Sequence, residues 1–367
     1  MKTKITHLTS AHPRYDTRIF VKICSSLAKV ENYEVNLVVA DSLGDEFKNG
    51  IHIYDVGKLS GRINRMFKTT QNVFQKAKEL NSDIYHFHDP ELIPIALKLK
   101  KLGKKVIFDI HEDVPNQILA KPYLNKFSKY ILSKVYAIFE DVTAKRFDFL
   151  VTPTSYINER FIKINPNSVE IRNYPILDEL INDTPWNQRD RSVCHIGSLA
   201  QTRGVLEIVK AVGLSEVKLE LAGNFRPLSL ENDVKALDGY KYVNFHGFID
   251  RIQVQNILAN TKIGLVTLHP TDSYLDAVPV KMFEYMVSSI PVIASDFPFY
   301  RELLAGCDCV LFVDPLNPNE IADAITTLLN DDTLAKKMGE NGKKSVLQEF
   351  NWDIEEKKLY RIYESLV

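Results

Sequence analysis

Two charged residues interrupt an apolar stretch in the second half of this chain. Lys281 and Glu284 lie within AVPVKMFEYMVSSIPVIAS (277–295), close behind Pro279, which suits the start of a helix. The helix dipole disfavours a lysine in the first turn unless an anion lies there too. We therefore expect Lys281 to share a bound anion, and Glu284, about one turn deeper, to bind ribose hydroxyls. The alternative is that both are solvated surface charges.

A second anion site is predicted after CHIGSL (194–199), which has the composition of a strand. Gly197 and Gly204 let the backbone approach a ligand, and Arg203 stands just before the helix-periodic run VLEIVKAV. Backbone amides, the helix dipole and a guanidinium together attract an anion. Two such helix starts behind neighbouring strands, with an acid beside them, suit a nucleoside diphosphate.

The first half of the chain carries other polar residues at its predicted strand ends. His111 follows VIFDI and precedes Glu112 and Asp113. A histidine there could donate to a sugar hydroxyl or stabilise a developing phosphate charge, or it could be a structural histidine. We expect contacts to an acceptor substrate from Asp16, Arg18, Asp89, Glu91 and Glu112.

A metal site is the weaker interpretation of the histidines in YHFH (85–88). His86 and His88 share one face of a predicted strand, and Asp89 follows them. The sequence shows no third ligand beside them and no Asp-x-Asp metal motif. We therefore expect no metal ion in this protein.

Strand-like runs alternate with helical patterns along the whole chain, which is typical of parallel sheets covered on both faces. The predicted strands of the first half are KITHLTS (4–10), YEVNLVVA (33–40), IHIYDV (51–56), DIYHFH (83–88), KKVIFDI (104–110) and FDFLVTP (147–153). Those of the second half are RSVCHIGSL (191–199), VKLELAG (217–223), YVNFHGF (242–248), IGLVTLH (263–269), IPVIAS (290–295) and CVLFVD (309–314). Helices are predicted at about 17–29, 62–80, 92–102 and 125–145.

The proline-containing stretch NPNSVEIRNYPILDEL (165–180) looks like a joint between domains, because the alternation restarts after it. We predict a first α/β domain over residues 1–170 and a second over 171–350. Ligands of such sheets bind beyond the carboxyl ends of the strands. The sequence therefore predicts a site between the two halves.

Composition is that of a globular protein of two domains, with 367 residues, 45% apolar and 25% charged. Apolar runs are far shorter than the roughly 20 residues of a membrane span, and the N-terminus has no apolar signal core, so we expect no export. The four cysteines, at 24, 194, 307 and 309, suit a reducing compartment. Residues 1–150 carry 24 Lys and Arg against 17 Asp and Glu, whereas the remainder carries 22 against 30. The basic first half is expected to meet an anionic partner.

Several of these segments together resemble one known family. KMFEYMVSSIPVIASDFP (281–298) is similar to the nucleotide-sugar motif of family-4 glycosyltransferases, commonly K-L-F-E-Y-M-A-x-G-x-P-V-I-A-S. The pattern Gly197-Ser198-Leu, then Arg203-Gly204, matches a second motif of that family. HPRYDTRIF (12–20), YHFHDPELIP (85–94) and FDIHEDVPNQIL (108–119) resemble a bacterial branch that builds surface polysaccharides. NWDIEEKKLYRIYESL (351–366) resembles the C-terminal helix of the family, so the resemblance covers essentially the whole chain.

The resemblance implies a GT-B fold, in which two doubly wound Rossmann-like parallel-sheet domains face a cleft and residues 351–367 cross back to the first domain. It implies that Glu284 binds the ribose and that Arg203 and Lys281 bind the pyrophosphate of a donor held by the loop with Gly197, Ser198 and Gly204. It also favours a catalytic role for His111. These implied roles remain expectations.

The chain departs from the family pattern at two places. Asp276 stands where an acid, usually glutamate, contacts the donor sugar, and its side chain is one methylene shorter. The glycine that ends the motif helix is replaced by Ser288 or Ser289, and serine is strained where the backbone is left-handed. We therefore expect the local turn to differ.

The expected function is transfer of a sugar from a nucleotide sugar, UDP- or GDP-linked, to a hydroxyl acceptor with retention of configuration. No cofactor or metal is expected, because Arg203, Lys281 and helix dipoles would neutralise the departing diphosphate. The acceptor would be a growing or lipid-linked glycan, and the protein cytoplasmic. The basic, apolar-rich segments KLSGRINRMFKTTQNVFQKAKEL (58–80) and KPYLNKFSKYILSKVYAIF (121–139) could lie on anionic lipid, or could be ordinary solvated helices.

Three alternatives stay open at this point. A nucleotide-sugar epimerase can share the architecture but needs no acceptor. A non-catalytic scaffold descended from a transferase would bind donor without turnover. Nucleic-acid binding by the basic half is the weakest, because the aromatic platforms and basic stripes of the recognised modules are absent from the sequence.

Overall fold

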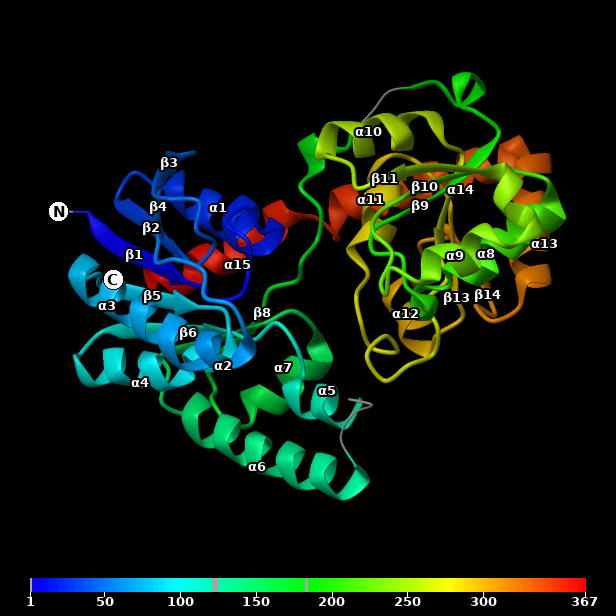
Figure 1. Ribbon diagram of the computed structural model, residues 1–367. Helices are drawn as coiled ribbons and strands as arrows, with labels where there is room; N and C mark the ends of the chain where they lie inside the picture. Colours follow the sequence, from blue (N-terminus) through cyan, green and yellow to red (C-terminus); the bar gives the residue numbers. More distant parts are fainter. Residues whose placement is uncertain (1, 121–124, 182–183) are drawn as a thin grey trace. The chain divides into compact units, whose positions relative to one another are not determined.

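The computed structural model describes residues 2–120, 125–181 and 184–367. The chain divides into two compact units: unit 1 contains Met1–Asn173 and Asp353–Val367, and unit 2 contains Tyr174–Trp352. Each unit is built around its own sheet, with helices packed against it (Figure 1). The sequence places the boundaries after residues 170 and 350, a few residues away from these.

Among the described residues, unit 1 has an eight-stranded sheet in the order β3-β4-β2-β1-β5-β6-β7-β8. Neighbouring strands are parallel except for β3, which pairs antiparallel with β4. The strands are β1 (Thr3–Leu8), β2 (Tyr33–Val39), β3 (Glu46–Lys48), β4 (Ile51–Asp55), β5 (Ile84–Phe87), β6 (Lys105–Asp109), β7 (Phe149–Thr152) and β8 (Ser168–Glu170). The central strands β1, β5 and β6 bring the polar residues at their carboxyl ends to one edge of the sheet.

The helices of unit 1 follow the predicted ranges closely. A π-helical segment, η1 (Thr17–Cys24), leads into α1 (Ser25–Ala28), and α2 (Arg62–Asn64), η2 (Arg65–Thr69) and α3 (Thr70–Leu80) follow one another without a break. The others are η3 (Pro90–Leu92), α4 (Ile93–Lys101), α5 (Val114–Ala120), α6 (Lys126–Ala144), α7 (Ser155–Ile162) and the C-terminal α15 (Trp352–Glu364).

Among the described residues, unit 2 has a six-stranded parallel sheet in the order β11-β10-β9-β12-β13-β14. The strands are β9 (Ser192–Ile196), β10 (Lys218–Ala222), β11 (Val243–Gly247), β12 (Ile263–Val266), β13 (Val292–Ser295) and β14 (Val310–Val313). The helices include η6 (Gln201–Arg203), α8 (Val205–Ser215), α9 (Leu230–Lys235), α10 (Arg251–Asn260), α11 (Val280–Val287), α12 (Pro298–Leu303), α13 (Pro318–Asn330) and α14 (Asp332–Gln348).

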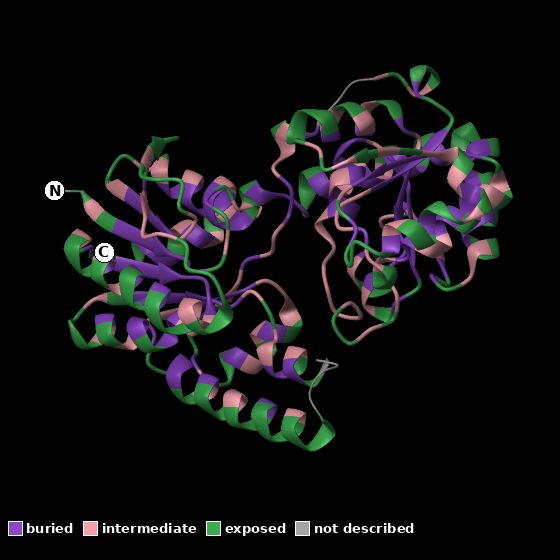
Figure 2. Cartoon of the chain, in the orientation of Figure 1, coloured by how far each residue is buried: buried purple, intermediate pink, exposed green. Residues whose placement is uncertain are grey.

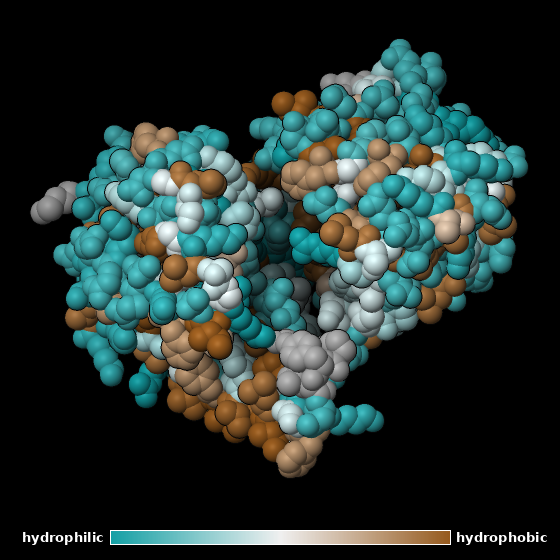
Figure 3. Space-filling view, in the orientation of Figure 1, coloured by the Kyte–Doolittle hydropathy of each residue, from teal (hydrophilic) through white to brown (hydrophobic). Residues whose placement is uncertain are grey.

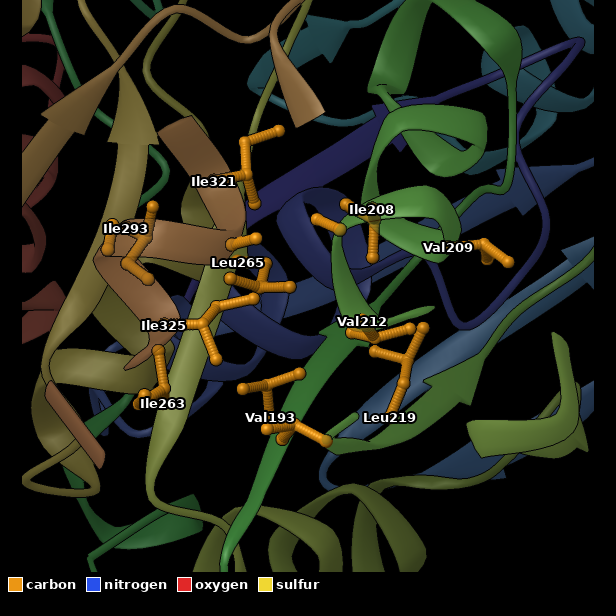
Figure 4. Packing of buried hydrophobic residues seen from close by; sticks show 14 of the residues in the cluster. Val193, Ile208, Val209, Val212, Leu219, Ile263, Leu265, Ile293, Ile321 and Ile325 are labelled. Atoms are coloured by element: carbon orange, nitrogen blue, oxygen red, sulfur yellow. The ribbon is translucent and has the colours of Figure 1, made fainter. Parts of the chain in front are cut away.

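The central strands of both sheets are buried on both faces, so their sequences are more continuously apolar than those of the outer strands β3 and β11 (Figure 2). In unit 2, side chains of α8 and α13 pack onto β9, β10 and β12, as Figure 4 shows for Val193, Ile208, Val212, Leu219, Ile263, Leu265, Ile321 and Ile325. This packing fixes α8 against the sheet, whereas the buried residues of α11 belong to a second apolar cluster, with Val266 of β12 and Val292 of β13.

Two short strands were absent from the sequence prediction. β3 and β8 have three residues each, and β8 lies within the stretch interpreted as a joint. Both are outer strands of the sheet of unit 1, where a short pairing needs little apolar sequence. The two doubly wound parallel sheets themselves were predicted correctly.

The C-terminal helix α15 belongs to unit 1, and its red ribbon lies beside the blue N-terminal elements in Figure 1. Leu359, Ile362 and Tyr363 are buried there. The Tyr360 hydroxyl donates to the Ser26 carbonyl over 3.1 Å, and Glu355 accepts from the backbone N–H of Arg172 over 3.0 Å. Helix α15 therefore completes the first unit.

Within the part of the chain that the structure describes, no helix combines the length and apolarity that crossing a bilayer requires.

Candidate functional site

Lys281 is buried in the first turn of α11 beside a neutral histidine. Its ammonium lies 3.3 Å from each ring nitrogen of His195 on β9. Burial, and then the charge of Lys281 itself, hold the pKa of His195 well below its usual value, so its Nδ1–H donates to the Leu265 carbonyl over 3.1 Å. Burial, and then the positive charge of Arg203, lower the pKa of Lys281 to about 7. This lysine lacks a carboxylate ion pair within the described residues, and an anion would stabilise its charge.

The loop with Arg203 lies at the start of α8 and requires glycine. Gly204 has a φ of 74°, and a Cβ there would lie 2.1 Å from the Thr267 carbonyl oxygen. Gly204 is also the N-cap of α8, which therefore starts without a side-chain cap on its first backbone N–H groups. A Cβ on Gly197 would lie 4.0 Å from a guanidinium nitrogen of Arg203, so Arg203 passes over that glycine. The uncapped helix start and the two cations together can bind a diphosphate.

A second glycine supports this loop, and sequence reasoning missed it. Gly223, after β10, has a φ of 139°, and a Cβ there would lie 1.7 Å from the Gly197 carbonyl oxygen. The two loops therefore touch backbone to backbone, which fixes the position of Gly197 and of the half-buried Ser198 beside it.

Glu284 is half-buried one turn after Lys281, and it forms an ion pair. Arg251 of α10 donates to Glu284 over 2.9 Å and, through its other terminal nitrogen, to Glu179 over 2.9 Å. The site that the sequence assigns to a ribose thus contains a guanidinium as well. Binding of ribose hydroxyls to Glu284 would compete with Arg251 or place Arg251 against the ligand.

The two departures from the family pattern have different outcomes. Ser289 has a φ of 55° and is therefore the strained residue, whereas Ser288 has a φ of −82° and donates to the Leu180 carbonyl over 3.0 Å. A Cβ on Gly339 of α14 would lie 2.2 Å from the Ser289 carbonyl oxygen, so this turn packs tightly. Asp276 is half-buried in a turn before α11.

In unit 1, His111 lies directly against a buried carboxylate. Its Nε2 is 3.0 Å from Oδ2 of Asp109, the last residue of β6. Arg18 of η1 clamps the same carboxylate, with Nη2 2.8 Å from Oδ1 and Nε 3.0 Å from Oδ2. Burial alone would raise the pKa of Asp109, but Arg18 and the two histidines beside it hold that pKa well below its usual value. Asp109 therefore stays ionised and accepts hydrogen bonds.

Behind Asp109, buried rings continue across the sheet to α15. His88 Nδ1 lies 3.0 Å from Asp109 Oδ2, and His88 Nε2 lies 3.1 Å from Nδ1 of His7. The Tyr363 hydroxyl of α15 lies 3.4 Å from His7 Nε2 and 2.8 Å from His86 Nδ1. This histidine chain, defined as His88, His7, Tyr363 and His86, joins strands β1 and β5 to the last helix.

A second histidine lies beside His111. The His12 and His111 rings have centroids 4.8 Å apart, and His12 Nδ1 is 2.9 Å from Oδ1 of Asp89. Burial would lower the pKa of His12, but the hydrogen bond and the charge of Asp89 raise it overall. The two rings thus lie side by side with different carboxylate partners.

A cavity of about 650 Å³ opens next to His12 in unit 1. Its lining includes the cations Lys58, Arg62 and Arg65 and the hydroxyls of Ser10, Ser60 and Thr69. Asp41 also lines it, but Arg14 binds both of its carboxylate oxygens at 2.7 Å. Arg65 forms an ion pair with Glu91 over 2.7 Å, so Lys58 and Arg62 give the lining its positive character, which favours a polar ligand with negative charge.

Comparisons with known proteins identify the family of the chain. The family model described as "Glycosyltransferase Family 4" matches residues 17–172, and the one described as "Glycosyl transferases group 1" matches residues 178–345. The chain belongs to the family 4 glycosyltransferases.

Individual relatives share only about a quarter of their residues with this chain over the matched segments. An uncharacterized glycosyltransferase of Methanocaldococcus jannaschii, MJ1069, is 25% identical over 221 residues, which are 58% of this chain and 55% of that protein. The chain spans about half or less of the length of the curated relatives it matches.

Solved structures show the fold. The sucrose-phosphate synthase of Thermosynechococcus elongatus superimposes with a TM-score of 0.78 at 16% identity, over 100% of this chain and 99% of that one. Alr3699/HepE of Anabaena, in complex with UDP and glucose, has a TM-score of 0.75 at 14% identity, over 99% of this chain and 100% of the other. Both likenesses establish that this glycosyltransferase has the GT-B fold.

The residues expected to contact an acceptor in this glycosyltransferase make contacts inside unit 1. Arg18 is buried against Asp109 and donates to the Ile171 carbonyl over 2.9 Å, so in this structure it positions groups inside unit 1. Asp16 caps η1 by accepting from the backbone N–H groups of Arg18 and Ile19, both over 2.9 Å, and does not pair with the Arg18 guanidinium.

Asp89 and Glu112 have different surroundings. Asp89 is almost fully buried, and its Oδ2 accepts from the backbone N–H groups of Ser10 and Ala11 over 2.6 and 3.1 Å. Its carboxylate therefore organises the loop after β1 and holds His12. Glu112 is exposed and accepts a hydrogen bond from Gln117.

Sequence reasoning missed Asp109, His12, His195 and Arg251. Asp109 was hidden as the last residue of an apolar strand, and its importance depends on Arg18, 91 residues away. His12 and His195 lie within HPRYDTRIF and CHIGSL, motifs already singled out, so these were findable signals. The sequence showed no third candidate metal ligand beside His86 and His88, but the fold brings His7 to them.

Proposed function

We propose that this glycosyltransferase moves a sugar from a nucleoside diphosphate sugar to a hydroxyl acceptor with retention of configuration and without a divalent metal. The observation that carries the proposal is the buried ammonium of Lys281 beside the Arg203 charge, at the uncapped start of α8. Two cations that repel each other at a helix start are stabilised by a bound diphosphate. The similar fold of Alr3699/HepE, a protein with UDP and glucose bound, supports a nucleotide-sugar donor.

In the proposed reaction, the bond between the anomeric carbon and the diphosphate oxygen breaks while the acceptor oxygen bonds to the same face of that carbon. The acceptor's proton passes to the departing diphosphate, so no external base is consumed. Arg203, Lys281 and the amides at the start of α8 stabilise the charge that develops on the diphosphate. Asp276 is assigned to a sugar hydroxyl and Glu284 to the ribose.

The donor is tested with a thermal-shift panel of UDP-, GDP-, dTDP- and ADP-sugars on the wild type, Glu284→Ala and Lys281→Met. A nucleotide at about 100 times its Kd adds about 2.7 kcal/mol of stability. We expect one nucleotide class, UDP- or GDP-linked, to stabilise the wild type and to stabilise both variants less. A panel with no stabilising nucleotide contradicts the donor site.

Turnover distinguishes the alternatives. Release of nucleoside diphosphate only when an acceptor hydroxyl is supplied supports transfer, and the anomeric configuration of the product tests retention. Donor binding without turnover would favour a scaffold, and conversion of the donor sugar without acceptor would favour an epimerase. Full activity in a chelator supports the metal-independent reaction.

The acceptor is proposed to bind in the cavity of unit 1 and to be a lipid-linked or growing glycan of surface-polysaccharide assembly. The cations of the cavity suit a phosphate or carboxylate on such an acceptor. Lys58→Ala should raise the KM for an anionic acceptor and leave the KM for the donor unchanged. An equal effect on donor and acceptor would count against this assignment.

Peripheral membrane contact is proposed at α6, whose polarity is inverted. Its buried side carries Ser133, Glu140 and Thr143, and Glu140 pairs with Arg160 over 2.9 Å. Its exposed side carries Phe127, Tyr130, Ile131, Leu132, Val135, Ile138, Phe139 and Val142, and the brown surface along α6 is visible in Figure 3. Residues 121–124, at the start of the segment predicted to touch lipid, lie outside the described residues.

The charge of this helix favours anionic lipid as the partner. Lys126 and Lys134 are exposed on α6, and Lys145 and Arg146 are exposed just beyond it, whereas its acids Glu140 and Asp141 both pair with Arg160. An apolar face rimmed by cations is the pattern of an interfacial helix.

The membrane proposal is tested by co-sedimentation with vesicles containing phosphatidylglycerol. Ile131→Ser with Ile138→Ser should abolish co-sedimentation, and the matched control Leu43→Ser with Phe47→Ser, at other exposed apolar positions, should not. Equal binding of both double variants would overturn the proposal, as would equal binding to neutral vesicles.

A further inference from the structure

The buried hydrogen bonds around Asp109 have one consistent direction. An ionised carboxylate only accepts, and His88 Nδ1 and His111 Nε2 each lie 3.0 Å from Asp109 Oδ2 and 3.2 Å from each other. The arrangement that gives the shared oxygen the most donors has the proton of His88 on Nδ1 and that of His111 on Nε2, both directed at Asp109. Burial lowers the pKa of His88 to about 3 and that of His7 well below its usual value. The rings of His88 and His7 are therefore neutral, and each has one N–H.

The direction then passes along the histidine chain without a conflict. Because His88 donates through Nδ1, its Nε2 accepts from His7 Nδ1–H, and His7 Nε2 accepts from the Tyr363 hydroxyl. The Tyr363 oxygen in turn accepts from His86 Nδ1–H over 2.8 Å. His86 Nε2 is left as a bare acceptor, in agreement with its having no hydrogen-bond partner among the described residues.

The opposite direction is physically worse. If Tyr363 donated to His86 Nδ1 instead, His86 would carry an N–H on the buried Nε2 with no partner among the described groups. His7 Nε2 would also face the Tyr363 oxygen without a hydrogen between them. Each buried polar group left without a partner costs about 1–3 kcal/mol.

We propose that Asp109, oriented by Arg18 and by the histidine chain, is a positioning residue that holds His111 with its Nε2–H directed inward and Nδ1 presented to the substrate. His111 then accepts a hydrogen bond from a sugar hydroxyl, and does not donate to a phosphate. The sequence left both roles open. The contact between His111 and a sugar substrate rests on the proposed function, whereas the protonation pattern of the rings does not depend on it.

A shared metal ion is the competing explanation for this cluster. The ligand atoms of His88, Asp109 and His111 lie within 4.8 Å of one another, and so do those of His7, His86 and His88. However, Arg18 already neutralises Asp109, and Oδ2 receives N–H groups from Arg18, His88 and His111. Hydrogen bonds alone therefore account for the geometry.

The first test is long-range ¹H–¹⁵N correlation of the nine imidazoles in the full-length protein, assigned by single substitutions. We expect the Nδ1–H tautomer for His7, His86 and His88 and the Nε2–H tautomer for His111. Observation of His111 with its proton on Nδ1, or of one bound metal ion per chain in elemental analysis, would overturn the proposal. Neither measurement needs a substrate.

The second test is Asp109→Asn, which puts two N–H donors where the shared acceptor oxygen was. His88 Nδ1 and His111 Nε2 must then accept, and we expect His111, His88, His7 and His86 all to move their proton to the other nitrogen. With the donor and acceptor identified, kcat should fall by about 10²- to 10⁴-fold, as when an orienting carboxylate becomes an amide, with the donor KM within about threefold. Unchanged tautomers in a folded variant would overturn the proposal.

Two further variants separate positioning from packing. In Tyr363→Phe, His7 and His86 should change while His88 and His111 keep their tautomers, because Asp109 still sets the direction. In His88→Asn, whose amide still donates to Asp109, His111 should stay Nε2–H. If His111 changes in either variant, the direction does not originate at Asp109. If the expected tautomers are observed but no sugar is transferred, the proposed function is contradicted and the tautomer pattern is still confirmed.

Discussion

At the scale of single residues, Lys281 has the most consequential environment. Burial, reinforced by Arg203, lowers its pKa to about 7, and a bound diphosphate would raise that pKa. Between pH 7 and the pKa of the bound state, the free chain is neutral at this nitrogen and the complex is protonated. Binding in that window must take up a proton, so affinity falls as pH rises, and below pH 7 it is flat.

Proton uptake by Lys281 is measured by titration calorimetry of the nucleotide in buffers of different ionisation enthalpy. At pH 8 we expect uptake approaching one proton per nucleotide by the wild type and close to zero by Lys281→Met. Equal uptake by both proteins would show that another group titrates, and Arg203 with the helix start would then bind the anion alone.

Ser289 is the second residue with a measurable consequence. A left-handed backbone costs an L-residue about 1–2 kcal/mol relative to glycine, and the φ of Ser289 is 55°. We expect Ser289→Gly to raise the free energy of unfolding by about 1 kcal/mol in urea titration, because glycine also has more freedom in the unfolded chain. Ser289→Ala keeps the strain and should change little. A destabilised glycine variant would show that the serine hydroxyl matters more than the strain.

At the scale of elements, the start of α8 depends on the close approach of Gly204 to β12. A Cβ at residue 204 would lie 2.1 Å from the Thr267 carbonyl oxygen, whereas a Cβ on Gly103, with a similar φ of 80°, would meet nothing within 4 Å. Gly204→Ala should therefore lower the free energy of unfolding by more than about 3 kcal/mol and abolish the nucleotide thermal shift. Gly103→Ala should cost only about 1–2 kcal/mol of strain. Similar decreases in the free energy of unfolding of both variants would mean that the backbone after β12 moves away from the new Cβ without an energetic penalty.

At the scale of the whole molecule, the last helix decides the stability of unit 1. Leu359, Ile362 and Tyr363 are at most 2% exposed, and burying each contributes about 1.5–3 kcal/mol, a sum comparable with the stability of a domain. Truncation after Trp352 should remove the thermal transition of unit 1 and leave that of unit 2, with its nucleotide shift. Truncation after Ser365 should leave both transitions in calorimetry. Loss of both after the longer truncation would show that the units do not fold separately.

The amino-acid pattern alone was enough to predict the two α/β sheets, and it also singled out the residues proposed to bind phosphate. Apolar runs of strand length, separated by helical periods, have few other ways to bury both faces, so each expected strand appears. Gly204, Arg203, Lys281 and Glu284 were proposed from the sequence, because loops that bind phosphate use local features: a glycine, a helix start and a cation within a few residues. The same kind of local comparison narrowed the strained serine to Ser288 or Ser289, and the backbone φ of 55° identifies Ser289.

Only the tertiary structure decided what the charged groups of unit 1 do. Arg18 and Asp109 are 91 residues apart, and His86 meets Tyr363 across 277 residues. Such partners are chosen by which strands are neighbours in the sheet and by where α15 docks, and no local pattern contains either. Burial then determines the protonation states of these neighbours, because a carboxylate or imidazole removed from water needs hydrogen-bond partners and has a shifted pKa. That is why Arg18 and Asp89, expected at the acceptor, turned out to hold the protein's own histidines in place.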